Sequence, residues 1–179
     1  MIQFRLLHPG DTFQWATPRL STIWAISENG DVPLPMPEPW DSRLDVSENW
    51  RREMKRLIAA DSAMGAFCGN TCLAVAAATP LQQIHWWSLS ECVVDAPFRR
   101  NGIGTQLLLH LETHLVETMG AQVMVAYARY GDSAAQAFLT RNAYLVAGTE
   151  AEHHEMVDAW IYRKTLCDHR LAALSKSPA

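Results

Sequence analysis

The stretch from Glu91 to Leu111, ECVVDAPFRRNGIGTQLLLHL, decides the fold of this 179-residue chain. It starts with a short apolar run, is interrupted at Pro97, passes through a basic turn with two glycines, and continues as a leucine-rich segment with helical spacing. The stretch therefore predicts a strand, a turn and a helix in direct succession.

The turn has the composition of an anion-binding site. Gly102 and Gly104 let backbone N–H groups approach a ligand without an obstructing Cβ, and the following helix adds N–H donors and the positive end of its dipole. Arg99 and Arg100 precede the glycines and favour a phosphate group. The spacing matches neither a dinucleotide fingerprint, which needs a third glycine, nor a P-loop, which needs G-K-[ST].

The turn resembles the [RQ]-x-x-G-x-[GA] loop of the GNAT (Gcn5-related) N-acetyltransferases, matched by Arg99, Gly102 and Gly104. In that family the loop amides hold the pyrophosphate of acetyl-coenzyme A, and the preceding strand hydrogen-bonds its pantetheine arm. The resemblance implies an acyltransferase with acetyl-CoA as cosubstrate. The cofactor-binding residues that it implies are Cys92, Val93, Val94, Arg99, Arg100, Asn101, Gly102, Ile103, Gly104 and Thr105.

A second stretch, DSAAQAFLTRNAY from Asp132 to Tyr144, is similar to the GNAT motif N-x-x-A-x-x-[FL]-Y-x-x-x-G-[FY]. The resemblance implies that Asp132 and Phe138 also belong to the cofactor site. Many members use the motif tyrosine as general acid for the departing thiolate, but Leu139 stands at that position here. The tyrosines that could substitute are Tyr127, Tyr130 and Tyr144.

Hydrophobic periodicity and turn residues predict the order of elements along the chain. The expected strands are 2–7, 64–68, 71–78, 84–94, 122–128, 144–148 and 158–166, with Gly69-Asn70 as a hairpin turn. The expected helices are capped by Asp11 or Thr17, by Asp45, by Asn101, and by Asp132 or Ser133. The helix after Asn101 has an expected buried stripe of Leu107, Leu108, Leu111, Leu115 and Val116. This is the order of the GNAT fold, an α+β (mixed α/β) fold with a mostly antiparallel mixed sheet of about seven strands flanked by about four helices. We expect a single domain over residues 1–166 and a loose tail over 167–179.

Composition narrows the classes of partner. Hydrophobic residues make up 49% and charged residues 19% of the chain, and the net charge is −4. The acidic balance argues against nucleic acid as principal partner. Apolar stretches are too short to span a bilayer and the N-terminal residues lack a signal-peptide layout, so we expect a cytoplasmic protein with no membrane partner. We expect it to be a monomer or a homodimer. The four cysteines form no C-x-x-C pair, which favours reduced thiols.

Two polar clusters could in principle bind metal. In HLETH, His110 and His114 share a helix face with Glu112 between them in sequence, but a zincin helix needs Glu directly after the first His, so we expect a solvated helix face. The second cluster, EAEHHE over residues 150–155, lies between two strands, where a polar loop is expected. We therefore predict no metal site.

Direct attack of an amine on a thioester requires a neutral nitrogen, so a proton acceptor is useful. Many relatives place a Glu on the strand before the loop; the position used by several of them is Ser88 here, and the nearest carboxylate is Glu91. We predict Glu91 as general base, with His85, Asp31 and Glu38 as weaker candidates. A β-bulge would change the face that Glu91 presents.

The acceptor is predicted from the aromatic residues and acids around the expected site. Trp86 and Trp87 point to opposite faces of one strand, and Trp40 ends a proline-rich loop over residues 31–41. With the acids of that loop they favour a small cationic amine, such as a polyamine, an amino sugar or an aminoglycoside-like compound. The alternatives are a protein N-terminal or lysine acetyltransferase and a non-catalytic CoA-binding module.

Overall fold

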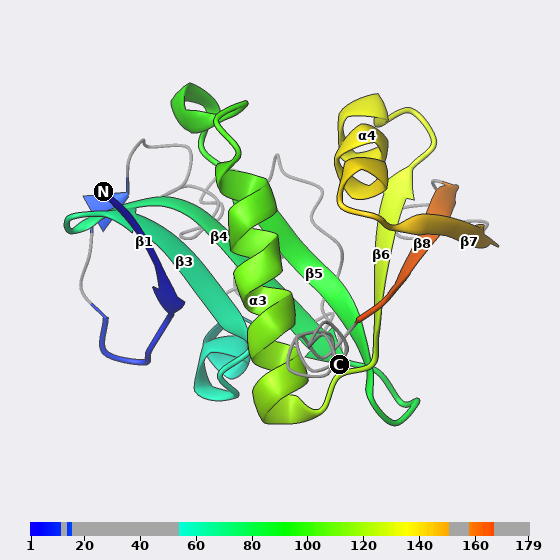
Figure 1. Cartoon of the computed structure of the whole chain (residues 1–179), viewed down its shortest axis with the longest axis horizontal. Coiled ribbons are helices and arrows are strands. Elements are labelled where there is room, and N and C mark those ends of the chain that lie inside the picture. Colours follow the sequence, from blue (N-terminus) through cyan, green and yellow to red (C-terminus); the bar gives the residue numbers. More distant parts are fainter. Residues whose placement is uncertain (12–13, 16–53, 151–157, 167–179) are drawn as a thin grey trace, which may run out of the picture. The chain divides into compact units, whose positions relative to one another are not determined.

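The computed structural model of the chain describes residues 1–11, 14–15, 54–150 and 158–166 (Figure 1). They fall into two compact units. One comprises the described residues of 1–78 together with 90–108, and the other comprises 79–89 together with those from 109 onward. A helix that begins at Asp11 is not found, because Gln14–Trp15 forms a β-strand. The alternative start at Thr17 and the start of the helix expected at Asp45 lie outside the described residues, and the single domain over 1–166 stays a prediction.

The described elements form a mixed α+β fold. The strands are β1 (Ile2–Leu6), β2 (Gln14–Trp15), β3 (Ala63–Cys68), β4 (Thr71–Pro80), β5 (Trp86–Val94), β6 (Val123–Arg129), β7 (Leu145–Glu150) and β8 (Ala159–Thr165). The helices are the 3-10 helix η1 (Ala96–Phe98), α3 (Ile103–Met119) and α4 (Ser133–Arg141). Hydrogen bonds join the strands in the order β1-β3-β4-β5-β6-β8-β7, with β2 on β4. The predicted fold class is confirmed. From residue 63 onward the strands and the two longer helices follow the predicted order, whereas the short elements β2 and η1 were not predicted.

The first unit is built on the β3–β4 hairpin. Gly69, at a φ of 58°, and Asn70 form its turn, as the sequence predicts, and β1 pairs antiparallel with β3. Residues 54–59 are helical and contribute Met54, Leu57 and Ile58 to the core. The strands add Ala63, Phe67, Cys72, Val75 and Ala77 to the same core. Small residues on β3 and β4 therefore leave room for the larger side chains of this helical segment.

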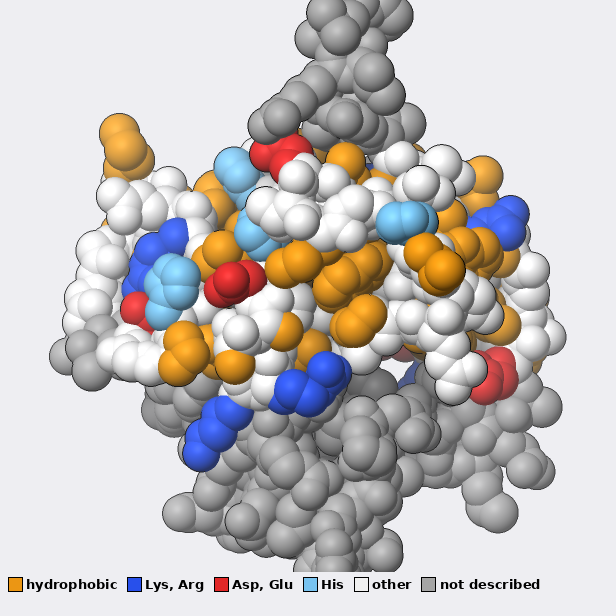
Figure 2. Space-filling view, turned by 90° about the horizontal axis from the view of Figure 1, so that it is seen from below, with side chains coloured by type: hydrophobic (Ala, Val, Ile, Leu, Met, Phe, Trp, Pro, Cys, Tyr) orange, Lys and Arg blue, Asp and Glu red, His pale blue; other side chains and the backbone are white. Residues whose placement is uncertain are grey.

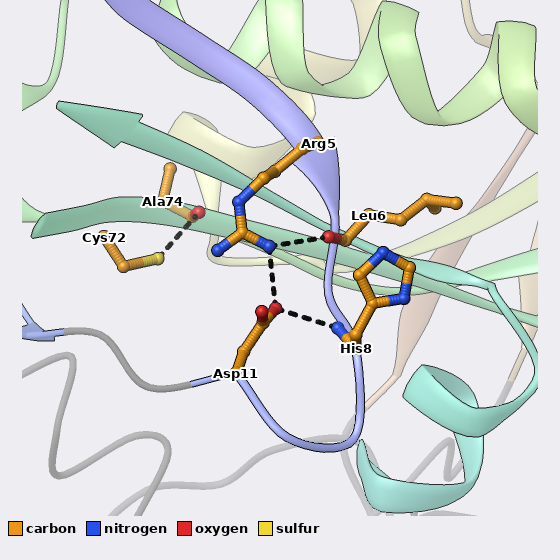
Figure 3. A network of polar contacts seen from close by, with 6 residues as sticks. All are labelled: Arg5, Leu6, His8, Asp11, Cys72 and Ala74. Atoms are coloured by element: carbon orange, nitrogen blue, oxygen red, sulfur yellow. Dashed lines mark hydrogen bonds and ion pairs between the residues drawn. The ribbon is translucent and has the colours of Figure 1, made fainter. Parts of the chain in front are cut away.

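A polar network holds the chain after β1 (Figure 3). Arg5 Nη1 donates to Asp11 Oδ2 at 2.7 Å and to the Leu6 carbonyl at 3.1 Å, while the His8 backbone N–H donates to the same carboxylate at 2.9 Å. The guanidinium also lies 4.2 Å from the centroid of the Phe67 ring. The turn that ends β1 is therefore fixed by one carboxylate shared between a side chain and the backbone.

The second unit is organised around β6. This strand pairs antiparallel with β8, which pairs antiparallel with β7, and it pairs parallel with β5. Asp132, one of the two predicted caps, caps α4 through a 2.9 Å hydrogen bond from the Ala135 N–H. Asn142, through which the helix was expected to run, occupies the C-cap. Within the described residues, no helix combines the length and apolar character needed to cross a lipid bilayer.

Helix α3 runs through both units, with Ile103–Leu108 in the first and Leu109–Met119 in the second. Its predicted stripe is confirmed: Leu107, Leu108, Leu111 and Leu115 are fully buried and Val116 is half-buried. The helix ends at Met119, and Gly120 follows it with a left-handed φ of 65°, while the Ala121 N–H donates to the Leu115 carbonyl at 3.0 Å.

The beginning of α3 differs from the expectation. Asn101 does not cap the helix, since its side-chain amide donates to the Phe98 carbonyl at 3.5 Å. Gly102 occupies the N-cap position, and its carbonyl accepts the first helical bond from Gln106 at 3.0 Å. The left-handed φ of 77° at Gly102 explains this, because a glycine adopts it without steric cost.

Candidate active site

The end of β5 is fixed by backbone and side-chain bonds. The Asp95 N–H donates to the Leu73 carbonyl on β4 at 2.9 Å, and the Asp95 carboxylate accepts from the Ala96 N–H at 2.8 Å, which starts η1. Pro97 lies in the first turn of that helix, where its missing N–H costs nothing. The chain therefore leaves β5 in a defined direction toward Arg99.

The two arginines of the turn have different surroundings. Arg99 donates from Nε to the Val94 carbonyl at 2.8 Å, so its side chain folds back over the end of β5. Arg100 is exposed and has a φ of 65°, a left-handed conformation that costs a non-glycine residue about 1–2 kcal/mol. Backbone strain of this kind is concentrated at functional sites.

The backbone between Arg100 and Thr105 presents a group of N–H donors. Left-handed residues at Arg100 and Gly102 are typical of the backbone concavities that bind anions. In the first turn of α3, the N–H groups of Ile103, Gly104 and Thr105 precede the first helical bond, so they have no acceptor within the helix. No acidic residue lies in that turn. The arrangement suits a phosphate group.

The strand before this turn is only partly paired with β6. The parallel ladder joins Trp86 to Val123, Trp87 to Met124 and Ser88 to Val125, and it ends there, although β5 continues to Val94. The predicted pantetheine-binding residues lie in the continuation and are half-buried: Cys92, Val93 and Val94.

Strand register assigns the residues of the second unit to two faces. Trp87, Met124 and Lys164 align on one face, to which α3 is tied because its Glu112 pairs with Lys164. Ser88 and Val125 align on the other face. Trp86 and Trp87 occupy successive positions of β5, so their side chains point to opposite faces of the strand, as predicted. Trp86 is half-buried, whereas Trp87 is buried with 8% exposure. Trp40 lies outside the described residues.

The candidate bases differ in position. Glu91 is 9% exposed and is one of the few buried polar residues among those described. It lies on β5 three residues after Ser88, the last residue of β5 that pairs with β6. His85 precedes β5, at a φ of 65°, and its carbonyl accepts from Gln122 and Val123. His85 is thus a turn residue at the far end of the strand from the phosphate turn. Asp31 and Glu38 lie outside the described residues.

The tyrosines considered as proton donors have distinct environments. Tyr144 is 1% exposed and its hydroxyl donates to Glu112 at 2.8 Å. The hydroxyl proton is therefore already used in a buried hydrogen bond. Tyr130 is exposed, with its ring centroid 4.9 Å from that of Trp160. Tyr127 on β6 is half-buried; burial raises its pKa, and the charge of Glu150 raises it further.

The second motif is placed on α4. Asp132 forms the N-cap, Phe138 is half-buried, and Leu139, at the position of the motif tyrosine, is buried with 3% exposure. Leu139 therefore has a packing role.

The HLETH segment of α3 is not uniformly solvated. His110 is exposed as expected, but Glu112 is 4% exposed and accepts from Lys164 Nζ at 2.6 Å as well as from Tyr144. A sequence signal for this burial exists, because Glu112 follows Leu108 by four residues and so continues the apolar stripe. In the described part of the chain, no group of three His, Cys, Asp or Glu side chains is arranged to hold a metal ion.

The family model "Acetyltransferase (GNAT) family" matches residues 13–144, which include the turn and most of both units. The chain belongs to this family. Like other GNAT proteins, it is an acyltransferase that transfers an acetyl group. No curated protein matches the chain in sequence.

Solved GNAT structures share the fold at low sequence identity. An aminoglycoside 6'-N-acetyltransferase complexed with coenzyme A is 18% identical, with a TM-score of 0.58 over 67% of this chain and 81% of that chain. A GNAT acetyltransferase from Streptococcus pneumoniae is 16% identical, with a TM-score of 0.65 over 93% and 100%. The ribosomal-protein-S18-alanine N-acetyltransferase from Escherichia coli is 18% identical, with a TM-score of 0.58 over 93% and 94%.

Proposed function

We propose that this GNAT protein transfers the acetyl group of acetyl-CoA to the amine of a small cationic molecule, such as a polyamine, an amino sugar or an aminoglycoside-like compound. The observation that carries the cofactor half is the turn between Val94 and Thr105. Its left-handed backbone, the first-turn N–H groups of α3 and the two arginines together offer hydrogen bonds and positive charge to a pyrophosphate.

The strand preceding the turn supports the placement of the pantetheine arm. An extended ligand that bears amides can hydrogen-bond to a strand as another strand would, and the last residues of β5 lead directly into the turn. Cys92, Val93 and Val94 are the residues we assign to this contact. Asp132 and Phe138 on α4 remain candidates for cofactor contact on the strength of the second motif.

The chemistry requires an amine free of its extra proton. An alkylammonium with a pKa of about 10.4 is mostly charged at neutral pH, so a base that accepts a proton raises the reactive fraction. We assign that role to Glu91, directly or through a water, with Ser88 on the same strand. The neutral nitrogen then forms a C–N bond to the acetyl carbon while the C–S bond breaks; the nitrogen loses its extra proton to solvent to give the amide, and the thiolate takes a proton from solvent.

The loss of the motif tyrosine is compatible with turnover. Leu139 cannot donate a proton, but a thiol with a pKa of about 8.5 is a tolerable leaving group as the thiolate. Tyr144 is committed to Glu112, so among the tyrosines Tyr127 and Tyr130 remain as possible donors.

The proposal that the acceptor is a small cationic amine rests on the charge of the protein and on its aromatic side chains. Trp86 is half-buried on the strand that bears Glu91, and a net charge of −4 favours a cationic partner. Trp40, Asp31 and Glu38 would add aromatic surface and negative charge if the proline-rich loop faces the site. Among the fold neighbours one acts on aminoglycosides and another on a ribosomal-protein alanine.

The test is thiol release from acetyl-CoA by purified protein, with panels of free amines, amino sugars and short peptides. We expect turnover on at least one small cationic amine. Turnover confined to peptides would overturn the acceptor assignment and favour a protein acetyltransferase. Absence of acetyl-CoA binding in calorimetry would overturn the cofactor assignment.

A further inference from the structure

Strand β7 stands at one end of the strand order, beside β8 (Figure 1). Among the described strands β8 is its only hydrogen-bonded neighbour, so the outer edge of β7 can accept another strand. Leu145 is 73% exposed and Val146 is 55% exposed. Because successive side chains of a strand point to opposite faces, the apolar surface here belongs to the edge of the sheet rather than to one of its faces.

Exposure of apolar side chains does not by itself distinguish β7. Figure 2 shows hydrophobic side chains at several places on one face of the molecule, and Ile84 is 80% exposed in the turn before β5. The apolar residues of β7 differ because they lie on a strand edge. The sequence of β7, LVAGTE, contains neither lysine nor proline, two residues that commonly keep edge strands from pairing.

A bulge in β7 gives the two ends of the strand the same orientation. Leu145 pairs with Arg163 and Glu150 pairs with Ala159, and the register shifts by one residue between these pairs. Arg163 and Ala159 are four positions apart on β8 and share a face, so Leu145 and Glu150 share that face as well. In a strand without the bulge, residues five positions apart would point to opposite faces.

The bulge therefore makes β7 complementary to a second copy of itself. Around a twofold axis perpendicular to the sheet, full-length antiparallel pairing places Leu145 opposite Glu150 of the second copy, and Val146 opposite Thr149. Both members of each pair then lie on the same face, as antiparallel partners must. The residues at the axis, 147–148, are alanine and glycine, whose small size lets the two strands approach.

Charge is also complementary in this arrangement. The exposed Arg163 lies beside Leu145 in the same row of the sheet. Glu150 of the second copy would extend that row by one strand, which brings its carboxylate toward the guanidinium across the leucine. The twofold axis repeats the arrangement, so each dimer contains it twice.

We propose that this acetyltransferase forms a homodimer in which the β7 strands of two copies pair antiparallel, so that the sheet continues from one copy into the other. The occupant of the edge is a second copy rather than an unrelated peptide, because the matched orientation of the two strand ends is required only for pairing of β7 with itself. The inference does not depend on where acetyl-CoA or the amine binds.

Sedimentation equilibrium tests the dimer. We expect the parent protein to have twice the chain mass of 20.1 kDa. The decisive variant is Leu145→Glu: within one copy the new carboxylate faces Arg163, which is compatible with folding, whereas in the dimer it lies opposite Glu150 of the second copy. Because this like-charge contact occurs twice, the Kd of the dimer should rise about tenfold or more.

Further variants test the register and the edge. Leu145→Glu/Glu150→Lys places opposite charges across the axis and should restore the dimer, and its failure to do so would overturn this register. Val146→Lys puts a charge on the other face of the same edge and should also weaken the dimer. Ile84→Glu is the matched control, since it charges an exposed apolar residue outside any strand edge and should leave the Kd unchanged.

Circular dichroism melting identifies the variants that fold, and only these are compared. A parent protein that is monomeric overturns the proposal. A dimer that resists both Leu145→Glu and Val146→Lys, or one that Ile84→Glu weakens equally, also overturns it, because the interface would then lie elsewhere.

Discussion

The Nε of Arg99 donates to the carbonyl of Val94 at 2.8 Å, which joins the phosphate turn to the last residue of β5. One guanidinium nitrogen thus holds the backbone while the other donors of the side chain stay available for an anion. The same residue shapes the turn and supplies charge to it.

Arg99→Ala should weaken acetyl-CoA binding because it removes both the bond to Val94 and a positive charge. Arg99→Lys should recover part of the affinity, since it restores the charge without the fork of donors. Calorimetry at low and high salt separates the contribution of the charge to binding from that of the hydrogen bond to Val94, because salt screens the charge contribution. An alanine variant that binds like the parent would exclude Arg99 from the site.

Gly102→Ala should destabilise the protein for a backbone reason alone. The φ of Gly102 is 77°, and an added Cβ would meet no atom within 4 Å, so the expected loss is the left-handed penalty of about 1–2 kcal/mol. Gly131→Ala is a matched control, because its Cβ also enters open space but its φ is not in the left-handed region. Denaturant titration should show a loss for the first variant and none for the second; equal effects would contradict this account.

The thiols offer a test of the cofactor position. Burial raises the pKa of Cys72 to about 12, so it should resist alkylation, whereas the exposed Cys68 should react. Cys92 is half-buried on the proposed pantetheine strand, and acetyl-CoA should slow its labelling without changing that of Cys68. Peptide mass mapping after timed alkylation gives the rates. Labelling of Cys92 that is indifferent to acetyl-CoA would place the cofactor elsewhere.

Asp11 should make stability depend on acidity. Partial burial acts to raise the pKa of this carboxyl, but the Arg5 hydrogen bond, the His8 N–H and the Arg5 charge together hold it below its usual 3.8. A lowered folded-state pKa contributes stability above the unfolded value, and the contribution is lost as pH falls through the folded value. Asp11→Asn should therefore lower the melting temperature at neutral pH, with a gap from the parent that narrows below pH 3.8. A gap of constant size would show that the charge of Asp11 plays no part.

Features that depend on neighbouring residues could be predicted from the sequence. The β3–β4 hairpin follows from Gly69-Asn70, and the start of α4 follows from Asp132, because each signal and its effect lie within a few residues. The strand, turn and helix around Gly102 were predictable for the same reason. The predicted N-cap of α3 is nevertheless wrong. Asn is favoured at N-caps, but the N-cap here has a left-handed φ, which glycine adopts more readily, so Gly102 occupies the position instead of Asn101.

Features that depend on distant partners could not be predicted in this way. Helical spacing places Glu112 in line with the buried stripe of α3, but it does not identify the partners that satisfy its oxygens, Tyr144 and Lys164, which lie 32 and 52 residues further along the chain. The same bond removes Tyr144 from the candidate proton donors. The face of Glu91 depends likewise on how β5 pairs with its neighbours, which composition and periodicity do not determine.

Glu91→Gln tests the proposed base. Glu91 is a buried carboxylate on the strand that enters the phosphate turn, and positioned proton transfer typically contributes about a hundredfold to ten-thousandfold in rate. We expect kcat near neutral pH to fall by about tenfold or more, with the KM for acetyl-CoA little changed because the amide keeps the size of the carboxylate. The deficit should shrink as pH rises, since the amine substrate then loses its proton to solvent and no longer needs the base. Ser88→Ala on the same strand, whose hydroxyl has no proton-accepting charge, should have a smaller effect with no recovery at high pH. A pH–rate profile that is unchanged in the Gln variant would falsify the assignment of Glu91 while leaving the cofactor turn intact.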